Sequence, residues 1–245
     1  MKRILSILIA LLLFAGSQAQ IGRYPFAKTP SSSTLLTGLI SYWKFDESSG
    51  TLDDIHGAND GTNDGATYSI TGKINTALGF TASETDYVNI GNPTNLQLTS
   101  AGSISCWAYT TGSTGSVILS KGTLANGLNG YILAFSSGKL TAIIGNASNA
   151  AQAESVATST YNVYNHCVMT WNATTLTVYL NGVSASVEGL TAASSTYNLK
   201  IGADESGSFW ANGAIDEIAI WNITLTAGQV AALYNSGSGK AYSTF

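Results

Sequence analysis

Residues 175–186 read TLTVYLNGVSAS and carry the clearest β-hairpin signal of the chain. The run before Asn181 is rich in β-branched and aromatic residues, which are typical of strands. Asn181 and Gly182 are residue types that readily adopt the two positive φ angles of a type I′ turn. The stretch therefore predicts two antiparallel strands joined by a two-residue turn.

Short apolar runs of the same kind lie on both sides of this hairpin. They alternate with a period of two and are separated by Gly and Asn turns, a pattern typical of sheets. The series predicts an all-β protein built as a two-sheet antiparallel sandwich. The runs lie at residues 39–45, 74–80, 86–90, 103–109, 116–120, 131–135, 139–145, 166–171, 199–202 and 214–221.

One short helix is predicted near the C-terminus. Thr226 as N-cap and Gln229 three residues later form a capping box. Val230, Leu233 and Tyr234 follow as its apolar residues.

The composition excludes several classes of protein. Only 10% of the 245 residues are charged, against about 25% in an average soluble domain. Ten basic and fourteen acidic residues give a net charge of −4, and removing Lys2 and Arg3 with the leader leaves 8 against 14, or −6. The chain has no basic nucleic-acid footprint. After leader cleavage it has no run of about 18 apolar residues that would span a bilayer.

The N-terminus predicts export. Lys2 and Arg3 precede an apolar run, and Ser17, Gln18 and Ala19 form a small-residue cleavage pattern, so residues 1–19 are predicted to be a signal peptide. The alternative of an uncleaved anchor is disfavoured because the apolar run is short. Residues 20–37 are predicted to be an arm or linker and residues 38–245 the folded domain. The expected location is secreted, extracellular or at the cell surface.

Three segments carry a family resemblance: LISYWKFDESSGT (39–51), TVYLNG (177–182) and GAIDEIAIW (213–221) with the capped helix after it. In order and spacing they resemble laminin G-like, concanavalin A-like jelly-roll domains of the pentraxin-related superfamily. The resemblance implies a jelly-roll sandwich with six or seven strands in each sheet, often with a carbohydrate ligand. It does not imply one function, since this fold hosts lectins, adhesion modules and glycan-cleaving enzymes.

The two cysteines match the resemblance as well. Cys106 in SISCWAY and Cys167 in NHCVMTW lie in the strand context of the pair that pentraxins join in a disulfide. The resemblance therefore implies a bridge between them, which an oxidising compartment would maintain. Two free, buried thiols are the alternative.

The catalytic signals of related enzymes are missing from the sequence. A Glu-x-Asp-x-x-Glu run of the laminarinase type is absent, and Asp216 and Glu217 are adjacent, so on a regular strand they point to opposite faces. His166 lies beside Cys167 and is interpreted as a structural residue. We predict no catalytic residue and no enzyme activity.

The acidic residues suggest a calcium site. Six of them fall from Asp46 to Asp64 without a Lys or Arg, and calcium is a hard cation that binds such oxygens. In related jelly rolls calcium ties the N-terminal strand to a late one, and by that resemblance Asp46 and Asp216 are candidate ligands, with Asp53 or Asp54 as further ones. A solvated acidic loop is the alternative.

The candidate ligand-binding residues are aromatic and polar residues in predicted loops, because sugar rings stack on aromatic faces while polar groups bind their hydroxyls. Trp210 is the first candidate, since Gly, Ser and Asn surround it. Four other tryptophans, by contrast, are predicted to pack between the sheets: Trp43, Trp107, Trp171 and Trp221. The remaining ligand-binding candidates are Asp204, Glu205, Asn126, Asn129, Tyr161 and Tyr164.

These observations predict a secreted, non-catalytic, lectin-like module that binds glycan or another cell-surface ligand, with calcium as its one candidate cofactor. One alternative is a structural or adhesive subunit of a cell-surface or virion assembly, with residues 20–37 docked on a partner. A second is a glycan-cleaving enzyme with an unfamiliar site at Asp204 or Glu205.

Overall fold

The computed structural model describes residues 35–112, 115–123 and 129–245. The predicted signal peptide, residues 20–34 of the predicted arm and Asn126 lie outside these residues. No helix in the described part of the chain is long and apolar enough to cross a membrane.

The first sheet has eight strands and contains the first and last strands of the fold. Its strands are β1 (Leu39–Trp43), β3 (Thr67–Thr71), β4 (Thr76–Phe80), β6 (Ala101–Thr110), β11 (Tyr164–Asn172), β12 (Thr175–Leu180), β13 (Val183–Glu188) and β15 (Gly213–Trp221). They run in the order β13-β12-β11-β6-β15-β4-β3, with β1 also paired to β15. Every pairing is antiparallel.

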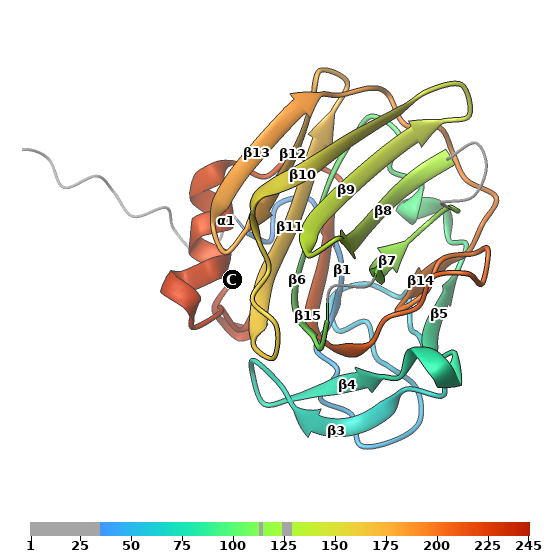
Figure 1. Cartoon of the computed structure of the whole chain (residues 1–245), viewed down its shortest axis with the longest axis vertical. Helices are drawn as coiled ribbons and strands as arrows, with labels where there is room; N and C mark the ends of the chain where they lie inside the picture. Colours follow the sequence, from blue (N-terminus) through green and yellow to red (C-terminus); the bar gives the residue numbers. More distant parts are fainter. Residues whose placement is uncertain (1–34, 113–114, 124–128) are drawn as a thin grey trace, which may run out of the picture.

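The second sheet has seven strands and is antiparallel as well. Its strands are β2 (Thr62–Asp64), β5 (Tyr87–Gly91), β7 (Ser116–Ser120), β8 (Asn129–Ser136), β9 (Lys139–Asn146), β10 (Ala150–Thr158) and β14 (Leu199–Ile201). The strand order is β10-β9-β8-β7-β14-β5-β2. The two sheets lie face to face (Figure 1), which confirms the predicted two-sheet sandwich.

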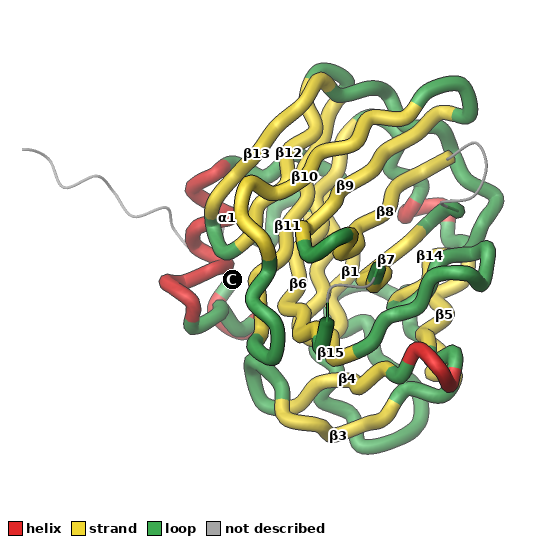
Figure 2. Tube along the Cα trace, viewed as in Figure 1, coloured by secondary structure: helices red, strands yellow, loops and turns green. Residues whose placement is uncertain are grey.

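The main core lies between the sheets because one side chain in two along each strand points inward. Ile104, Cys106 and Trp171 from the first sheet and Tyr131 and Leu133 from the second are 0–1% exposed. The rings of Tyr131 and Trp171 meet across the core with their centroids 5.3 Å apart. The yellow strands form the two layers of the molecule, long green loops connect them, and the main helix lies outside the sheets (Figure 2).

Helix α1 (Ala227–Tyr234) begins at Thr226, whose side chain and that of Gln229 form the predicted capping box. Val230 and Leu233 pack on the outer face of the eight-stranded sheet. Short 3₁₀ helices account for the remaining helical residues: η2 (Ala82–Glu84), η3 (Thr94–Leu96), η4 (Asn235–Gly237) and η5 (Tyr242–Thr244). The C-terminal segment thus covers one outer face of the sandwich.

The tryptophans divide between the two sides of the eight-stranded sheet. Trp43 and Trp171 lie in the core between the sheets, as predicted. Trp221 packs instead in the outer cluster under α1, and Trp107 stacks on Tyr234 at the end of that helix with the ring centroids 6.0 Å apart. The prediction of four inter-sheet tryptophans is therefore wrong for these two, because the C-terminal segment supplies a second apolar layer.

The ordered packing begins before Gly38. Leu35, which the sequence places in the arm, is 2% exposed and belongs to the outer cluster. Its carbonyl oxygen accepts a hydrogen bond of 2.7 Å from the Trp221 indole N–H.

The predicted hairpin is present between β12 and β13. Asn181 and Gly182 have φ angles of 51° and 83°, as a type I′ turn requires. At this point the register pairs Leu180 with Val183.

Candidate functional site

The candidate site lies on the outer face of the seven-stranded sheet, where the loop of residues 203–212 joins β14 to β15. Asp204 closes this loop. Its carboxylate accepts hydrogen bonds from the Ser206 hydroxyl at 2.6 Å and from the amides of Ser208 and Phe209 at 3.3 Å. Because Asp204 is fully buried, it shapes the loop, and the residues that follow it are the ones that face outward.

Trp210 lies beside Tyr87 of β5 with the ring centroids 6.1 Å apart. Lys200 of β14 places its ammonium 5.0 Å from the Tyr87 ring centroid and forms an ion pair of 2.7 Å with Glu205. A hydrogen bond to the Asp64 carboxylate raises the pKa of Tyr87. These residues form an aromatic and polar platform in which the charges of Lys200 and Glu205 are paired.

Phe209 stands beside a pocket on the same sheet face and is 39% exposed. The pocket floor crosses three strands in one register row, with Val117 of β7 next to Ala134 of β8 and Ala134 next to Thr141 of β9. About 650 Å³ of space, including the part open to solvent, is free of atoms here. The described residues that line it carry no charge: Gly115, Ser116, Val117, Ala134, Phe135, Ser136, Thr141, Ile143, Gln152 and Phe209.

Three of the predicted ligand-binding residues come together in this region. Trp210, Asp204 and Glu205 share the 203–212 loop. Glu205 is held in place, since its second carboxylate oxygen accepts a hydrogen bond of 2.9 Å from the Asn198 amide. Trp210 is the partly exposed aromatic residue of the three.

The other described candidates lie elsewhere. Asn129 is the first residue of β8, and its side-chain oxygen is buried without a hydrogen-bond partner among the described residues. Tyr161 places its hydroxyl against Gly138 in the turn between β8 and β9. Tyr164 belongs to the eight-stranded sheet and donates to the Thr71 carbonyl at 2.7 Å. Neither tyrosine is part of the platform.

The sequence reading missed three residues of this face. Phe209 is adjacent to Trp210 in the same Gly- and Ser-rich segment, so the reasoning that singled out Trp210 applied to it too. Tyr87 and Thr141 lie inside strands, and their positions on the outer face follow only from the sheet register.

Three of the four carboxylates predicted to bind calcium accept hydrogen bonds from the backbone. Asp54 is 6% exposed and accepts hydrogen bonds from four backbone amides, those of Tyr42, His56, Gly57 and Asn59. Asp53 is exposed on the loop before it. Within residues 35–112, 115–123 and 129–245, no three or more His, Cys, Asp or Glu side chains are grouped to hold a metal ion. Hydrogen bonds from backbone amides of the loop and of β1 to Asp54 therefore hold the acidic loop in place.

The other two predicted calcium ligands are also engaged with amides. Asp46 accepts from the Thr76 amide at 3.1 Å, and Asp216 accepts from the amides of Lys73 and Ile74 at 2.7 and 2.9 Å. Both carboxylates thereby hold the turn before β4.

Asp216 and Glu217 do not point to opposite faces of the sheet, and that prediction is wrong. The pairing of β15 with β6 is interrupted after Asp216 by a β-bulge, in which Glu217 has a φ angle of 53°. Ile215 and Ile218 both face the main core, so the two acids between them share the outer face. Burial raises the pKa of Asp216 to about 8 and that of Glu217 to about 7.

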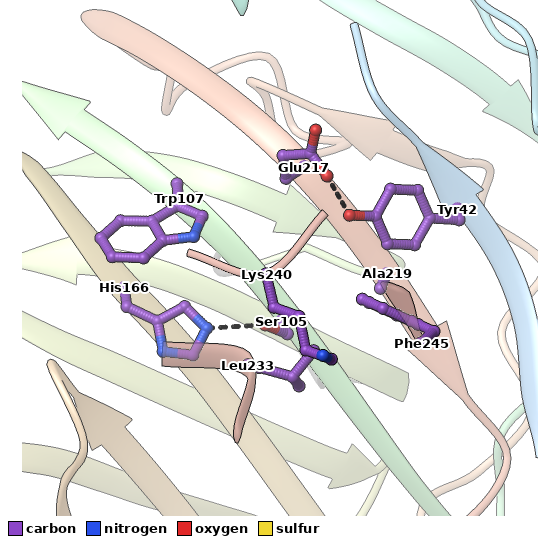
Figure 3. Close-up of a pocket in the computed structure, with 9 residues that line it drawn as sticks. All are labelled: Tyr42, Ser105, Trp107, His166, Glu217, Ala219, Leu233, Lys240 and Phe245. Atoms are coloured by element: carbon purple, nitrogen blue, oxygen red, sulfur yellow. Dashed lines mark hydrogen bonds between the residues drawn. The ribbon is translucent and has the colours of Figure 1, made fainter. Parts of the chain in front are cut away.

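A second, smaller pocket lies beneath α1, with Glu217 hydrogen-bonded to the Tyr42 hydroxyl on one side (Figure 3). On the other side Ser105 Oγ lies 3.0 Å from His166 Nε2. Burial lowers the pKa of His166 to about 3, so the imidazole is neutral. Leu233 and Phe245 from the C-terminal segment line the pocket, and we interpret it as a polar part of the packing.

Cys106 and Cys167 lie directly opposite each other on β6 and β11. Both are fully buried, and the structure holds them as free thiols. The neighbouring strands place the pair where the predicted bridge requires it, and the bridge itself stays a prediction.

A family model described as the concanavalin A-like lectin/glucanases superfamily matches residues 82–231, which is more than half of the 245 residues. The chain belongs to this superfamily, within its laminin G-like branch. No curated protein sequence matches the chain.

Solved structures with the same fold include binding domains of bacterial toxins. The binding domain of Paraclostridial Mosquitocidal Protein 1 has a TM-score of 0.68 at 14% identity, over 83% of this chain and 53% of that one. A structure of botulinum neurotoxin type C, whose cell entry is described as dependent upon interaction with two ganglioside molecules, has a TM-score of 0.66 at 15% identity, over 84% and 53% of the two chains. The binding domain of botulinum neurotoxin DC in complex with SialylT has a TM-score of 0.62 at 14% identity, over 82% and 52%.

These likenesses show the fold. The chain spans about half the length of the solved domains that it matches. Their ligands are properties of those toxins.

Proposed function

We propose that the chain is a non-catalytic carbohydrate-binding module that binds glycan on the outer face of its seven-stranded sheet. The proposal depends on the position of two aromatic residues in the 203–212 loop. Phe209 lines a pocket whose described lining residues are uncharged, and Trp210 lies beside Tyr87 in the adjacent platform. Aromatic faces beside polar groups are the chemistry that sugar rings require. The superfamily and the toxin binding domains of the same fold support this function.

A glycan array with purified residues 20–245 tests the proposal. We expect a defined set of glycans to bind, and the variants F209A and W210A to lose most of that binding. V183A is the matched control, because Val183 is 58% exposed on β13 of the other sheet. Silence of the wild-type protein across the array would contradict the proposal, as would unchanged binding by both aromatic variants.

We also propose that the protein acts outside the cytoplasm. Residues 1–19 support this with their charged start, apolar run and small-residue cleavage pattern. N-terminal sequencing of exported protein should find Gln20 as the first residue.

A structural or adhesive role is the second candidate, and exposed apolar residues on edge strands favour it. Val156 of β10 is 74% exposed, and Val183 and Val187 of β13 are 58% and 40% exposed. Unpaired strand edges are templates for protein contact. Stoichiometric oligomers in light scattering that dissociate in a V156K/V183K variant would favour this role, with residues 20–37 as a further docking segment.

Glycan cleavage has less support. Asp216 and Glu217 are 0% and 6% exposed. Asp216 lies against the turn at Lys73 and Ile74, and Glu217 lines the pocket under the C-terminal segment, so a polysaccharide would not reach them without movement of these segments. Asp204 is fully buried and Glu205 is ion-paired. Absence of reducing-end release from a broad polysaccharide panel is the expected result.

A further inference from the structure

The pocket beside Phe209 contains a hydroxyl group without a partner. Thr141 of β9 is 3% exposed, and its Oγ1 has no hydrogen-bond partner among the described residues. A buried hydroxyl normally has one, because leaving it unpaired costs free energy. Thr141 lines the pocket, and rotation about its Cα–Cβ bond moves the hydroxyl among the staggered positions without any backbone movement.

Thr141 has apolar neighbours toward β8 and, toward the sheet edge, its register partner Glu154 of β10, which pairs with Lys139 at 3.9 Å. Val117 and Ala134 are 1% and 6% exposed and form the floor beside it, with Ile143 on the same strand. The polar groups at the rim are already engaged in part, since Gln152 donates to Glu154 at 3.0 Å and the Ser116 hydroxyl accepts from the Asn212 amide at 3.3 Å. A ligand group that fits must therefore be small, largely apolar and able to make one hydrogen bond.

The common substituents of sugars differ in how well they meet this requirement. A ring hydroxyl would be buried against Val117 and Ala134 with one bond at most. A charged group would be buried on the same apolar floor, and the nearby charges of Glu154 and Lys139 already pair with each other. An acetamido group offers a methyl for the apolar floor and an amide N–H and C=O, either of which a threonine hydroxyl can bind.

We propose that the pocket beside Phe209 binds the acetamido group of an N-acetylated hexosamine residue, with the Thr141 hydroxyl as its hydrogen-bond partner. This inference rests on the proposed glycan binding and narrows it to a substrate class. The paired charges of Lys200 and Glu205 leave the adjacent platform without a free charge for an acidic sugar.

The test compares three trisaccharides with the same β-1,4 backbone by isothermal titration calorimetry. Chitotriose carries three acetamido groups, cellotriose carries hydroxyls in their place, and the chitosan trimer carries amines. We expect chitotriose to bind at least about tenfold more tightly than the other two, the size expected of one hydrogen bond and one buried methyl group.

Two variants separate the hydroxyl from the shape of the pocket. T141V keeps the volume and removes the hydroxyl, so chitotriose affinity should fall about five- to tenfold while cellotriose affinity stays the same. T67V is the matched control, because Thr67 is exposed on β3 of the other sheet. The thermal midpoint of T141V should equal or exceed that of wild type, since an unpaired buried hydroxyl is lost, and this verifies that the variant folds.

The outcomes are distinguishable. Equal affinity for chitotriose and cellotriose, or an equal loss of both in T141V, overturns the acetamido inference and leaves glycan binding standing. Binding of none of the three, together with silence on the array, overturns the proposed function and this inference with it.

Discussion

Asp216 and Glu217 are consecutive residues of β15, and their carboxyl groups lie on the same face of the sheet. The β-bulge at this point gives Glu217 a left-handed backbone, with a φ angle of 53°. A non-glycine residue in this conformation is strained. The bulge lets Asp216 hold the amides of Lys73 and Ile74 while Glu217 accepts from the Tyr42 hydroxyl, so β15 ties together two distant parts of the chain.

Asp216 should make the stability fall as the pH rises from about 4 to about 8. Burial raises its folded-state pKa to about 8 from the ordinary carboxyl value of 3.8, so the folded state retains a proton that the unfolded state has released. The free energy of unfolding should therefore decrease between pH 6.5 and 8, by on the order of one or two kcal/mol, and then level off. Urea denaturation at a series of pH values measures it.

The variant D216N provides the control for that profile. Its neutral amide preserves the shape of the carboxyl group and removes the titration, so the decrease between pH 6.5 and 8 should become smaller, with only the contribution of Glu217 remaining. A wild-type profile that stays flat in this window, or a D216N profile with the same slope, would contradict the assignment.

His166 should govern the acid side of the stability profile. Burial lowers its folded-state pKa to about 3, whereas the unfolded imidazole binds a proton with the ordinary histidine pKa of 6.5. Stability should therefore decrease as the pH falls below 6.5, because protons bind the unfolded state preferentially. Since Asp216 and Glu217 act in the opposite direction there, the effect is read as the difference between wild type and H166Q at pH 5 and pH 7. An equal difference at the two pH values would exclude His166 as the cause.

Local chemistry made parts of the fold predictable from the sequence. The turn at Asn181 and the helix that begins at Thr226 depend on residues that are neighbours in the chain. Strand β10, which reads AAQAESVAT, was missed because alanine and serine do not favour strands; pairing with β9 and burial of Ala153 stabilise it. The bulge at Glu217 was missed as well, because a regular alternation leaves no place for an extra residue.

In the candidate site too, residues set by their chain neighbours were predictable and residues set by strand pairing were not. Trp210 was recognisable because its immediate neighbours are Gly, Ser and Asn. Thr141 was not, since its significance depends on Val117 and Ala134, which come from two other strands and become its neighbours only through the sheet register. Glu205 was selected as a ligand-binding residue, and the ion pair with Lys200 that occupies it could not be read from the sequence.

Removing calcium should leave the thermal stability unchanged. The carboxylates of Asp46, Asp54 and Asp216 already accept backbone N–H bonds, so folding does not require a cation to neutralise them. Thermal midpoints measured in about 5 mM EDTA and in about 5 mM calcium should therefore agree. These concentrations are about a thousand times the calcium dissociation constant of a sensor-type protein site. A midpoint several degrees lower in EDTA, abolished in D46N, would instead establish an ion between Asp46 and Asp216.

Protein recovered from an oxidising compartment should contain a disulfide between Cys106 and Cys167. The two residues are register partners on β6 and β11, and no other cysteine competes with them, since the chain has two. Thiol titration after unfolding should find no free thiol, and reduction should lower the free energy of unfolding by up to about 4 kcal/mol, because the bridge closes a loop of about 60 residues. The double variant C106A/C167A should be insensitive to reductant and no more stable than the reduced protein, because it also loses the packing of the two buried sulfur atoms. Two reactive thiols per unfolded chain would show instead that the pair stays reduced and contributes only its packing in the core.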